Sequence, residues 1–592
     1  MLELVLISIL LIATGIIPGR ILVEKLASKL DLSIEEKLAV SFGISYFIYY
    51  LIGFAGYLLN LNKTNFNLIV LIFIILVCAV IFLGKKTHIE KEELKLVGYL
   101  LIAFSVVLAI QALLPIYNGG GWMGDWYEHY QRMQFWLNKY SPDFKFIDFY
   151  ILPSRPPLFN IVTYFYQSFL GQDFWIFQVI CSFINLVVLL PVYLILKNLL
   201  KVRFKYLFLI MAAILLLNPA FMRNLTYTWT RHLTNYYILL GVYFYIKGRK
   251  GLDFKYIYTA FALLSCGQLT HYSAVIYLVA ILFDYLVITM LNFKKSFKAL
   301  IITGIITIVI LSGWYGWSLK AYGAKDTFQS NTTYMDMKDK TLFDNINRDW
   351  LNLRNSIVPY FIYPELQSVN GLFIQNSKEG FYYDTIMAFY SDSLTGNLTF
   401  SLTIFLISWL ILKPLKFIKS LKENYKKQKY LNFIMQDKIF WAFFAIISFT
   451  VGIHVNPYQI CGCMHVTHQP LMILLICVAI KGLEQIKTKL LKALIICGIF
   501  IEGIIVTGSQ VIFKIPEDFS TMIYSRIFYG NYYYKVSNKL NFMYDKFADM
   551  KLIFDFYILG IMALTAFLLF NIALKQNEPA LSNQKPGPKK KP

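Results

Sequence analysis

One stretch of the chain, residues 119–132, concentrates ionisable side chains at spacings that suit chemistry. It reads Gly119-Gly-Gly-Trp122-Met-Gly124-Asp125-Trp126-Tyr127-Glu128-His129-Tyr130-Gln131-Arg132. If a helix begins near Asp125, the ionisable residues fall at positions i, i+3, i+4 and i+7 of one face: Asp125, Glu128, His129 and Arg132. Four ionisable groups would then converge at one place.

General acid–base catalysis is the chemistry that such a face could perform. Asp125 can take a proton from an acceptor hydroxyl group, with His129 or Glu128 positioning it. A purely structural alternative is an interfacial helix with a solvated charged face, in which Glu128 and Arg132 form an i,i+4 ion pair. We favour the catalytic interpretation, because an acidic cluster beside a glycine-rich segment is an unusual way to build only an anchor.

A neighbouring face of the same helix is apolar and aromatic, and it comprises Trp122, Trp126, Tyr130, Met133 and Leu137. Aromatic side chains are typical of the membrane interface, and amphipathic helices lie in the headgroup layer. The pattern therefore predicts a membrane-parallel external helix.

The composition of the whole chain indicates what must position this helix. The 592 residues are 57% hydrophobic and only 15% charged, which is outside the usual range of soluble proteins. Apolar runs long enough to cross a bilayer recur from residue 2 to residue 574. We predict an all-α polytopic membrane protein with about 13–15 transmembrane helices; one of these spans is expected at 205–222.

Basic residues gather in alternate short loops, which predicts the orientation of the chain. These loops are 20–37, 85–95, 197–205, 247–255, 294–298, 413–438 and 481–492, together with the C-terminal tail. Lysine and arginine mark the cytoplasmic side, so we expect an external N-terminus, a cytoplasmic C-terminus and an extracytoplasmic active site. Attraction to membrane lipid accounts for the net charge of +22, and no motif indicates nucleic acid. Richness in Lys, Ile, Asn and Tyr favours a prokaryotic plasma membrane.

Three long segments interrupt the spans and divide the chain. The expected units are N-terminal helices (1–117), an external loop with interfacial helices and the catalytic aspartate (118–172), further transmembrane helices (173–319), an external loop or lid (320–396), C-terminal helices with an external loop at 513–551 (397–576), and a disordered basic cytoplasmic tail (577–592).

Phosphate-binding candidates lie on the predicted external side, where all histidines except His88 fall. His271, at a junction between two short spans, suits contact with a donor phosphate, and guanidinium groups suit phosphate oxygens. The arginine candidates are Arg132, Arg155, Arg231, Arg348 and Arg354. For His232 and His454 we favour a structural role over a catalytic or binding one.

The segment Cys461-Gly-Cys463-Met-His465-Val-Thr-His468 offers four soft or borderline metal ligands. Its spacing matches no standard zinc pattern, so we predict no metal site. No cofactor is predicted, although a divalent cation stays possible. Gly84-Lys85-Lys86-Thr87 lacks the spacing of a phosphate-binding loop, which argues against an ATP-driven pump.

Two motifs carry a resemblance to a known family. Gly124-Asp125-Trp-Tyr-Glu128-His129-Tyr130, in the first large external loop, resembles the acidic signature of the GT-C superfamily of membrane glycosyltransferases, which includes protein mannosyltransferases and aminoarabinose transferases. Arg155-Pro156-Pro157-Leu158-Phe159-Asn160 resembles the Pro-Pro-Leu element that opens their next membrane segment. Looser similarities at 217–219, 269–272 and 469–471 extend the resemblance over much of residues 100–482.

The resemblance implies inverting transfer of a sugar from a polyprenyl-phosphate-linked donor to an acceptor on the external face. Asp125 would be the general base, and the family's second acidic position could be Glu128, Asp148 or Asp173. The acceptor could be a glycan, a lipid or a protein.

Two other functions stay open. A polysaccharide polymerase or ligase also uses polyprenyl-linked sugars on the outer face, but depends on external Arg and His residues. A solute transporter usually needs several buried ionisable groups, whereas Glu502 alone is an acid near the centre of a predicted span.

Overall fold

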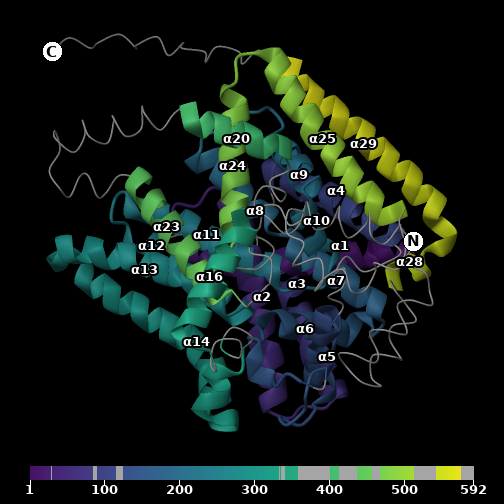
Figure 1. Cartoon of the computed structure of the whole chain (residues 1–592). Coiled ribbons are helices and arrows are strands. Elements are labelled where there is room, and N and C mark those ends of the chain that lie inside the picture. Colours follow the sequence, from purple (N-terminus) through teal and green to yellow (C-terminus); the bar gives the residue numbers. More distant parts are fainter. Residues whose placement is uncertain are drawn as a thin grey trace, which may run out of the picture.

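The computed structural model describes residues 1–27, 30–83, 90–114, 124–147, 149–331, 334, 340–357, 400–412, 437–456, 467–512 and 542–574. Every regular element in these ranges is helical, and the one β-bridge found there joins Phe146 to Tyr150. The all-α prediction is confirmed for this part of the chain (Figure 1).

Eight stretches of the described chain are long and apolar enough to cross a membrane. They are α1 (Leu2–Ala27), α2 (Ile34–Leu58), α4 (Lys91–Leu113), α7 (Phe174–Leu186) continued by α8 (Leu189–Leu194) and η2 (Ile195–Leu199), α13 (Ala274–Leu291), α14 (Phe293–Gln329), α25 (Lys489–Ile512) and α29 (Lys551–Leu574). Helices α25 and α29 run side by side along one flank of the bundle (Figure 1).

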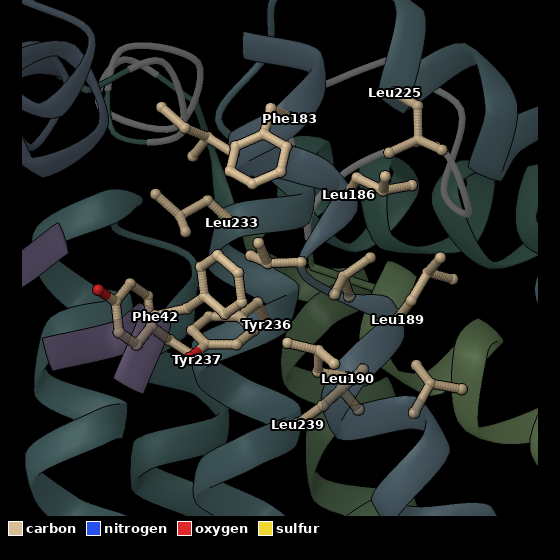
Figure 2. Packing of buried hydrophobic residues seen from close by; sticks show 14 of the residues in the cluster. Phe42, Phe183, Leu186, Leu189, Leu190, Leu225, Leu233, Tyr236, Tyr237 and Leu239 are labelled. Carbon is tan, nitrogen blue, oxygen red and sulfur yellow. The ribbon is translucent and has the colours of Figure 1, made fainter. Parts of the chain in front are cut away.

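The other predicted spans coincide with shorter or more polar helices. These are α3 (Lys63–Leu83), α11 (Arg231–Arg249), α12 (Phe254–Thr270), α20 (Phe400–Leu412), α23 (Asp437–Val455) and α24 (Gln469–Gln485). The core lies around α11, which is buried along almost its whole length. Figure 2 shows side chains of α2, α7, α8, α10 (Pro219–Thr226) and α11 packed together there, among them Phe42, Phe183 and Leu233.

The span predicted at 205–222 is instead a broken pair of helices, α9 (Leu207–Leu216) and α10 (Pro219–Thr226), bent by 85°. Asn218 causes the break, because its side chain accepts the N–H of Phe221 at 2.9 Å and caps α10. Pro219 follows as the first helical residue, where its missing N–H costs nothing. A hydropathy window does not detect this cap.

The loop predicted to begin at 320 also differs from the structure. Helix α14 continues past that point and bends at Gly323, whose φ of 78° favours glycine. A further helix, α16 (Leu342–Ile357), lies inside the predicted lid. Residues 358–399, most of the loop 513–551 and the whole tail 577–592 lie outside the described residues.

Four of the basic loops predicted to share one side, 20–37, 197–205, 247–255 and 481–492, lie at one end of the bundle. Lys197 forms an ion pair with Glu35, and Lys247 Nζ lies 2.7 Å from Glu36 Oε1. Further contacts at this end join Tyr256 to Asp31, Lys250 to Asp437, and Arg203 to Glu484. We call it the basic end.

The segment after α4 lies at the opposite end. Helix α5 (Gly124–Asn138) packs against α6 (Leu158–Leu170), and a short helical turn, η1 (Leu152–Ser154), precedes α6. Lys139 donates a hydrogen bond to Asn60 at the end of α2, and Tyr322 of α14 donates one to the carbonyl of Pro142. We call it the α5 end.

Candidate functional site

Helix α5 forms as predicted, and Asp125 is its second residue, although the side chain of Asp125 lies outside the described part. One turn further on, Glu128 and Arg132 are completely buried, and Arg132 Nε lies 2.7 Å from Glu128 Oε1. The predicted i,i+4 pair therefore exists, but it faces the interior. A solvated charged face is excluded for these residues.

The described part of the aromatic face also packs against protein. Met133 and Leu137 are buried, and the Tyr130 ring lies 4.8 Å from that of Phe174 in α7. The prediction that these side chains face headgroups is wrong for them, because α6, α7 and the end of α2 cover α5. The orientation of α5 relative to the membrane plane stays a prediction.

Arg132 holds the turn that leads into α6. Its Nη1 donates to the Leu152 carbonyl at 2.9 Å, and its Nη2 donates to the Ile151 carbonyl at 3.2 Å and to Ser154 Oγ at 2.6 Å. The guanidinium also lies 4.3 Å from the Phe146 ring centroid. Predicted as a phosphate ligand, Arg132 is thus occupied by protein groups and positions η1.

Arg155 is the second cation beside Glu128, with its Nε 3.8 Å from Oε1. Its Nη1 donates to the hydroxyl of Tyr272 at 3.4 Å, which joins α5 to the junction between α12 and α13. Burial raises the pKa of Glu128, but the guanidinium groups of Arg132 and Arg155 outweigh burial and hold that pKa below its usual value. Glu128 is therefore a buried carboxylate between two cations.

His129 is buried beside this group. Its Nδ1 lies 3.2 Å from Asn160 Oδ1, the last residue of the Arg-Pro-Pro-Leu-Phe-Asn motif. Burial lowers the pKa of His129 to about 3, so the imidazole is neutral at neutral pH. A neutral ring that bonds Asn160 suits positioning better than proton transfer near pH 7.

His271 enters the same region through its neighbour Tyr272. The two rings stack with centroids 4.3 Å apart, and His271 Nδ1 accepts the N–H of Ser273 at 3.2 Å. Because Tyr272 contacts Arg155, the structure brings predicted site residues from three parts of the chain to one place. This α5 cluster consists of Glu128, His129, Arg132, Arg155 and His271.

Arg231 lies at the start of α11, away from the contacts just described. Its guanidinium stacks 3.4 Å over the Trp229 ring, and its Nη1 lies 3.5 Å from Asn224 Oδ1.

Arg348 belongs to a second polar group, on α16 and at the end of α23. Its side chain is 3% exposed, and its Nη2 donates to the His454 carbonyl at 2.7 Å and to Asp349 at 3.1 Å. Among the described residues, Nε and Nη1 of Arg348 are buried with no hydrogen-bond partner. Arg354, in the last turn of α16, is half-buried. Buried guanidinium donors of this kind favour an anionic ligand.

His454 and His232 make ordinary structural contacts with protein groups. His454 Nδ1 lies 2.9 Å from Asp349 Oδ2, and His232 is buried with its Nε2 3.0 Å from the Phe221 carbonyl. Glu502, the acid in the middle of a span, accepts the N–H of Ser401 at 2.9 Å and its hydroxyl at 2.6 Å, which caps α20. This structural role accounts for Glu502 without a transported ion.

No group of three metal-binding side chains occurs among the described residues. Cys461, Cys463 and His465 fall outside those residues, as does Asp148. His468 is described and is buried, with its Nδ1 3.3 Å from Asn456 Nδ2. Asp173, another candidate second acid, precedes α7 at its N-cap position.

Two residues that contact the α5 cluster, Tyr272 and Asn160, were not predicted as site residues. Both lie inside quoted motifs, next to His271 and after Pro157-Leu158, so the motifs marked their neighbourhood. Their roles depend on contacts across 117 and 31 residues of sequence, which spacing along the chain does not reveal.

Two solved structures of ArnT from Cupriavidus metallidurans align with this chain. The one bound to undecaprenyl phosphate has a TM-score of 0.41 and 12% identity, covering 81% of this chain and 75% of that one. The apo structure has a TM-score of 0.42 and 11% identity, covering 82% and 76%. No family model and no curated protein matches the chain.

Proposed function

We propose that this chain is a membrane glycosyltransferase that moves a sugar from a polyprenyl-phosphate-linked donor to an acceptor at the α5 end, on the extracytoplasmic face. The observation that carries the proposal is the buried Glu128 carboxylate, held between Arg132 and Arg155 one turn after Asp125. Two guanidinium groups face the Glu128 carboxylate, and the partly exposed Arg155 supports a contact with the phosphate leaving group.

Asp125 and the α5 cluster divide the work of the proposed reaction. Asp125 is the general base, while Glu128, His129 and Arg132 position α5 against η1 and α6. Arg155, whose side chain is 11% exposed, and His271 are the groups that contact the donor phosphate. Arg231, Arg348 and Arg354 are further phosphate contacts outside the cluster.

The reaction balances with these groups alone. The acceptor hydroxyl oxygen attacks the anomeric carbon of the donor, and Asp125 takes the hydroxyl proton as the new carbon–oxygen bond forms. The bond from the anomeric carbon to the phosphate oxygen breaks, and its electron pair leaves with the polyprenyl phosphate. Attack opposite the leaving group inverts the anomeric configuration.

The test compares wild type with Asp125→Asn, purified with native lipid and given radiolabelled polyprenyl-phosphate sugars and a membrane extract as acceptor. The substitution keeps size and polarity but removes the base, so transfer should fall at least about a hundredfold. Asp143→Asn is the matched control, because Asp143 is an exposed aspartate in the same segment. Equal transfer by wild type and Asp125→Asn would refute the role of Asp125, and transfer by neither would refute the function.

A polysaccharide polymerase or ligase that uses polyprenyl-linked sugars is the second candidate. The two Arg348 donors that have no hydrogen-bond partner among the described residues favour it. Such an enzyme would lose activity on Arg348→Gln and keep it on Asp125→Asn. Solute flux into sealed vesicles without chemical change would instead indicate a transporter.

A further inference from the structure

A cationic cleft lies at the basic end, beside the first half of α4. It is lined by residues of α4, the α8–η2 segment and the start of α9, and its volume is about 140 Å³. The charged lining residues are Glu92, Lys95, Lys197 and Lys205. Three lysines face one glutamate, so the cleft attracts anions.

The lysines differ in how far protein groups already neutralise them. Lys197 pairs with Glu35, and Lys95 Nζ lies 3.6 Å from the exposed Glu92. Lys205 makes no ion pair with any residue that the structure describes, and its Nζ lies 5.5 Å from the Tyr206 ring centroid. Lys197 lies in a π-helical turn, a distortion that often marks functional sites. The cleft keeps uncompensated positive charge.

An apolar path leads from the cleft along α4. Lys95, Gly98, Tyr99 and Ile102 occupy positions i, i+3, i+4 and i+7, and so share one face of the helix. Ile102 is 44% exposed, and a side chain added at Gly98 would meet nothing within 4 Å. Because α4 is long and apolar enough to span a membrane, this open strip faces acyl chains.

We propose that the cleft is a binding site for an anionic phospholipid of the leaflet at the basic end. The phosphate lies between Lys197 and Lys205, and an acyl chain follows α4 past Gly98 to Ile102. Cationic pockets between helices bind anionic headgroups in this way. The site is separate from the proposed transferase site and does not depend on that function.

Native mass spectrometry of the full-length protein in detergent tests the proposal with phosphatidylglycerol, phosphatidylcholine, a polyprenyl phosphate and inorganic phosphate as probes. Phosphatidylglycerol should bind tightest. The double variant Lys197→Gln/Lys205→Gln should weaken its binding about thirtyfold. Lys294→Gln/Lys298→Gln removes the same charge from two exposed positions of another basic loop, and should change binding little.

Gly98→Leu separates the lipid from a free anion, because it fills the acyl path and leaves every lysine in place. It should weaken phosphatidylglycerol binding without affecting inorganic phosphate. Equal loss in the control pair, equal binding of phosphatidylcholine, tighter binding of the polyprenyl phosphate, or an unaffected Gly98→Leu would each overturn the proposal.

Discussion

The two ends of the bundle both carry charge, but the arginines of the α5 end and the lysines of the basic end differ in how far they are buried. At the α5 end, Glu128 and Arg132 have side chains no more than 1% exposed, and the guanidinium binds two carbonyls and a hydroxyl besides. At the basic end, Lys250 and Asp437 pair with 57% and 36% of their side chains exposed. The charges of the α5 cluster are buried, whereas the lysine pair at the basic end is solvated; the arginine of the basic end, Arg249, is buried against Asp284 at 2.8 Å.

The choice of cation follows from this difference. Arginine has five N–H donors in a rigid fork, so several fixed acceptors can satisfy it away from water. Lysine is a compact, strongly hydrated charge on a flexible stem, which suits loops that orient the chain and meet lipid headgroups. A buried arginine therefore indicates a geometry that the fold maintains, whereas an exposed lysine does not.

Removing one partner of the buried pair should have the largest effect. Glu128→Gln leaves Arg132 buried without its counter-charge, and should lower the free energy of unfolding by about 3–5 kcal/mol. Denaturant unfolding of wild type and variant in the same detergent measures this loss of stability. Glu35→Gln, which removes the partner of the half-exposed Lys197, should cost no more than about 1 kcal/mol. Equal losses in the two variants would contradict the contrast between the two ends.

Replacing the second cation of the α5 cluster should affect the reaction more than the fold. Arg155→Lys keeps the charge but loses the fork that contacts Glu128 and Tyr272. We expect transfer to fall about ten- to a hundredfold, mainly through a higher KM for the donor. Steady-state kinetics with varied donor measure it. Arg203→Lys, at an exposed position of the basic end, should be neutral, and an unchanged KM in Arg155→Lys would remove Arg155 from the donor site.

His129 should make the α5 end sensitive to acid. Its pKa is about 3 in the folded protein and about 6.5 in an unfolded chain. Below pH 6.5 the unfolded state binds the extra proton, so stability falls as the pH drops from 6.5 towards 3. Glu128, with its lowered pKa, acts in the same direction. The melting temperature of His129→Gln should decline less steeply between pH 7.5 and 4.5 than that of wild type, and identical slopes would refute the burial of a neutral His129.

The smallest effect belongs to the exposed pair at the basic end. Lys250→Gln removes the partner of Asp437, and should change the free energy of unfolding by less than about 1 kcal/mol. Thermal unfolding at low and high salt measures the change. A loss comparable to that of Glu128→Gln would show that solvation does not distinguish the two ends.

Hydropathy and charge sufficed for the helical architecture and for the grouping of the basic loops, because burial in lipid and charge bias act locally along the chain. The prediction failed at the break between α9 and α10, where a single side-chain cap at Asn218 decides the geometry. It also failed for the faces of α5. Helical spacing placed Glu128 and Arg132 together, but the direction that they face depends on what covers the helix.

The sequence by itself determined that the chain is a polytopic helical protein, and that Asp125, Glu128, His129 and Arg132 occupy successive turns of one helix. Only the tertiary structure decided that Arg132 holds η1, that Arg155 reaches Glu128 and Tyr272, and that His271 joins them. The reason is physical. Periodicity within one helix is a local property, whereas the partners of a buried charge come from distant segments whose positions depend on the packing of the whole bundle.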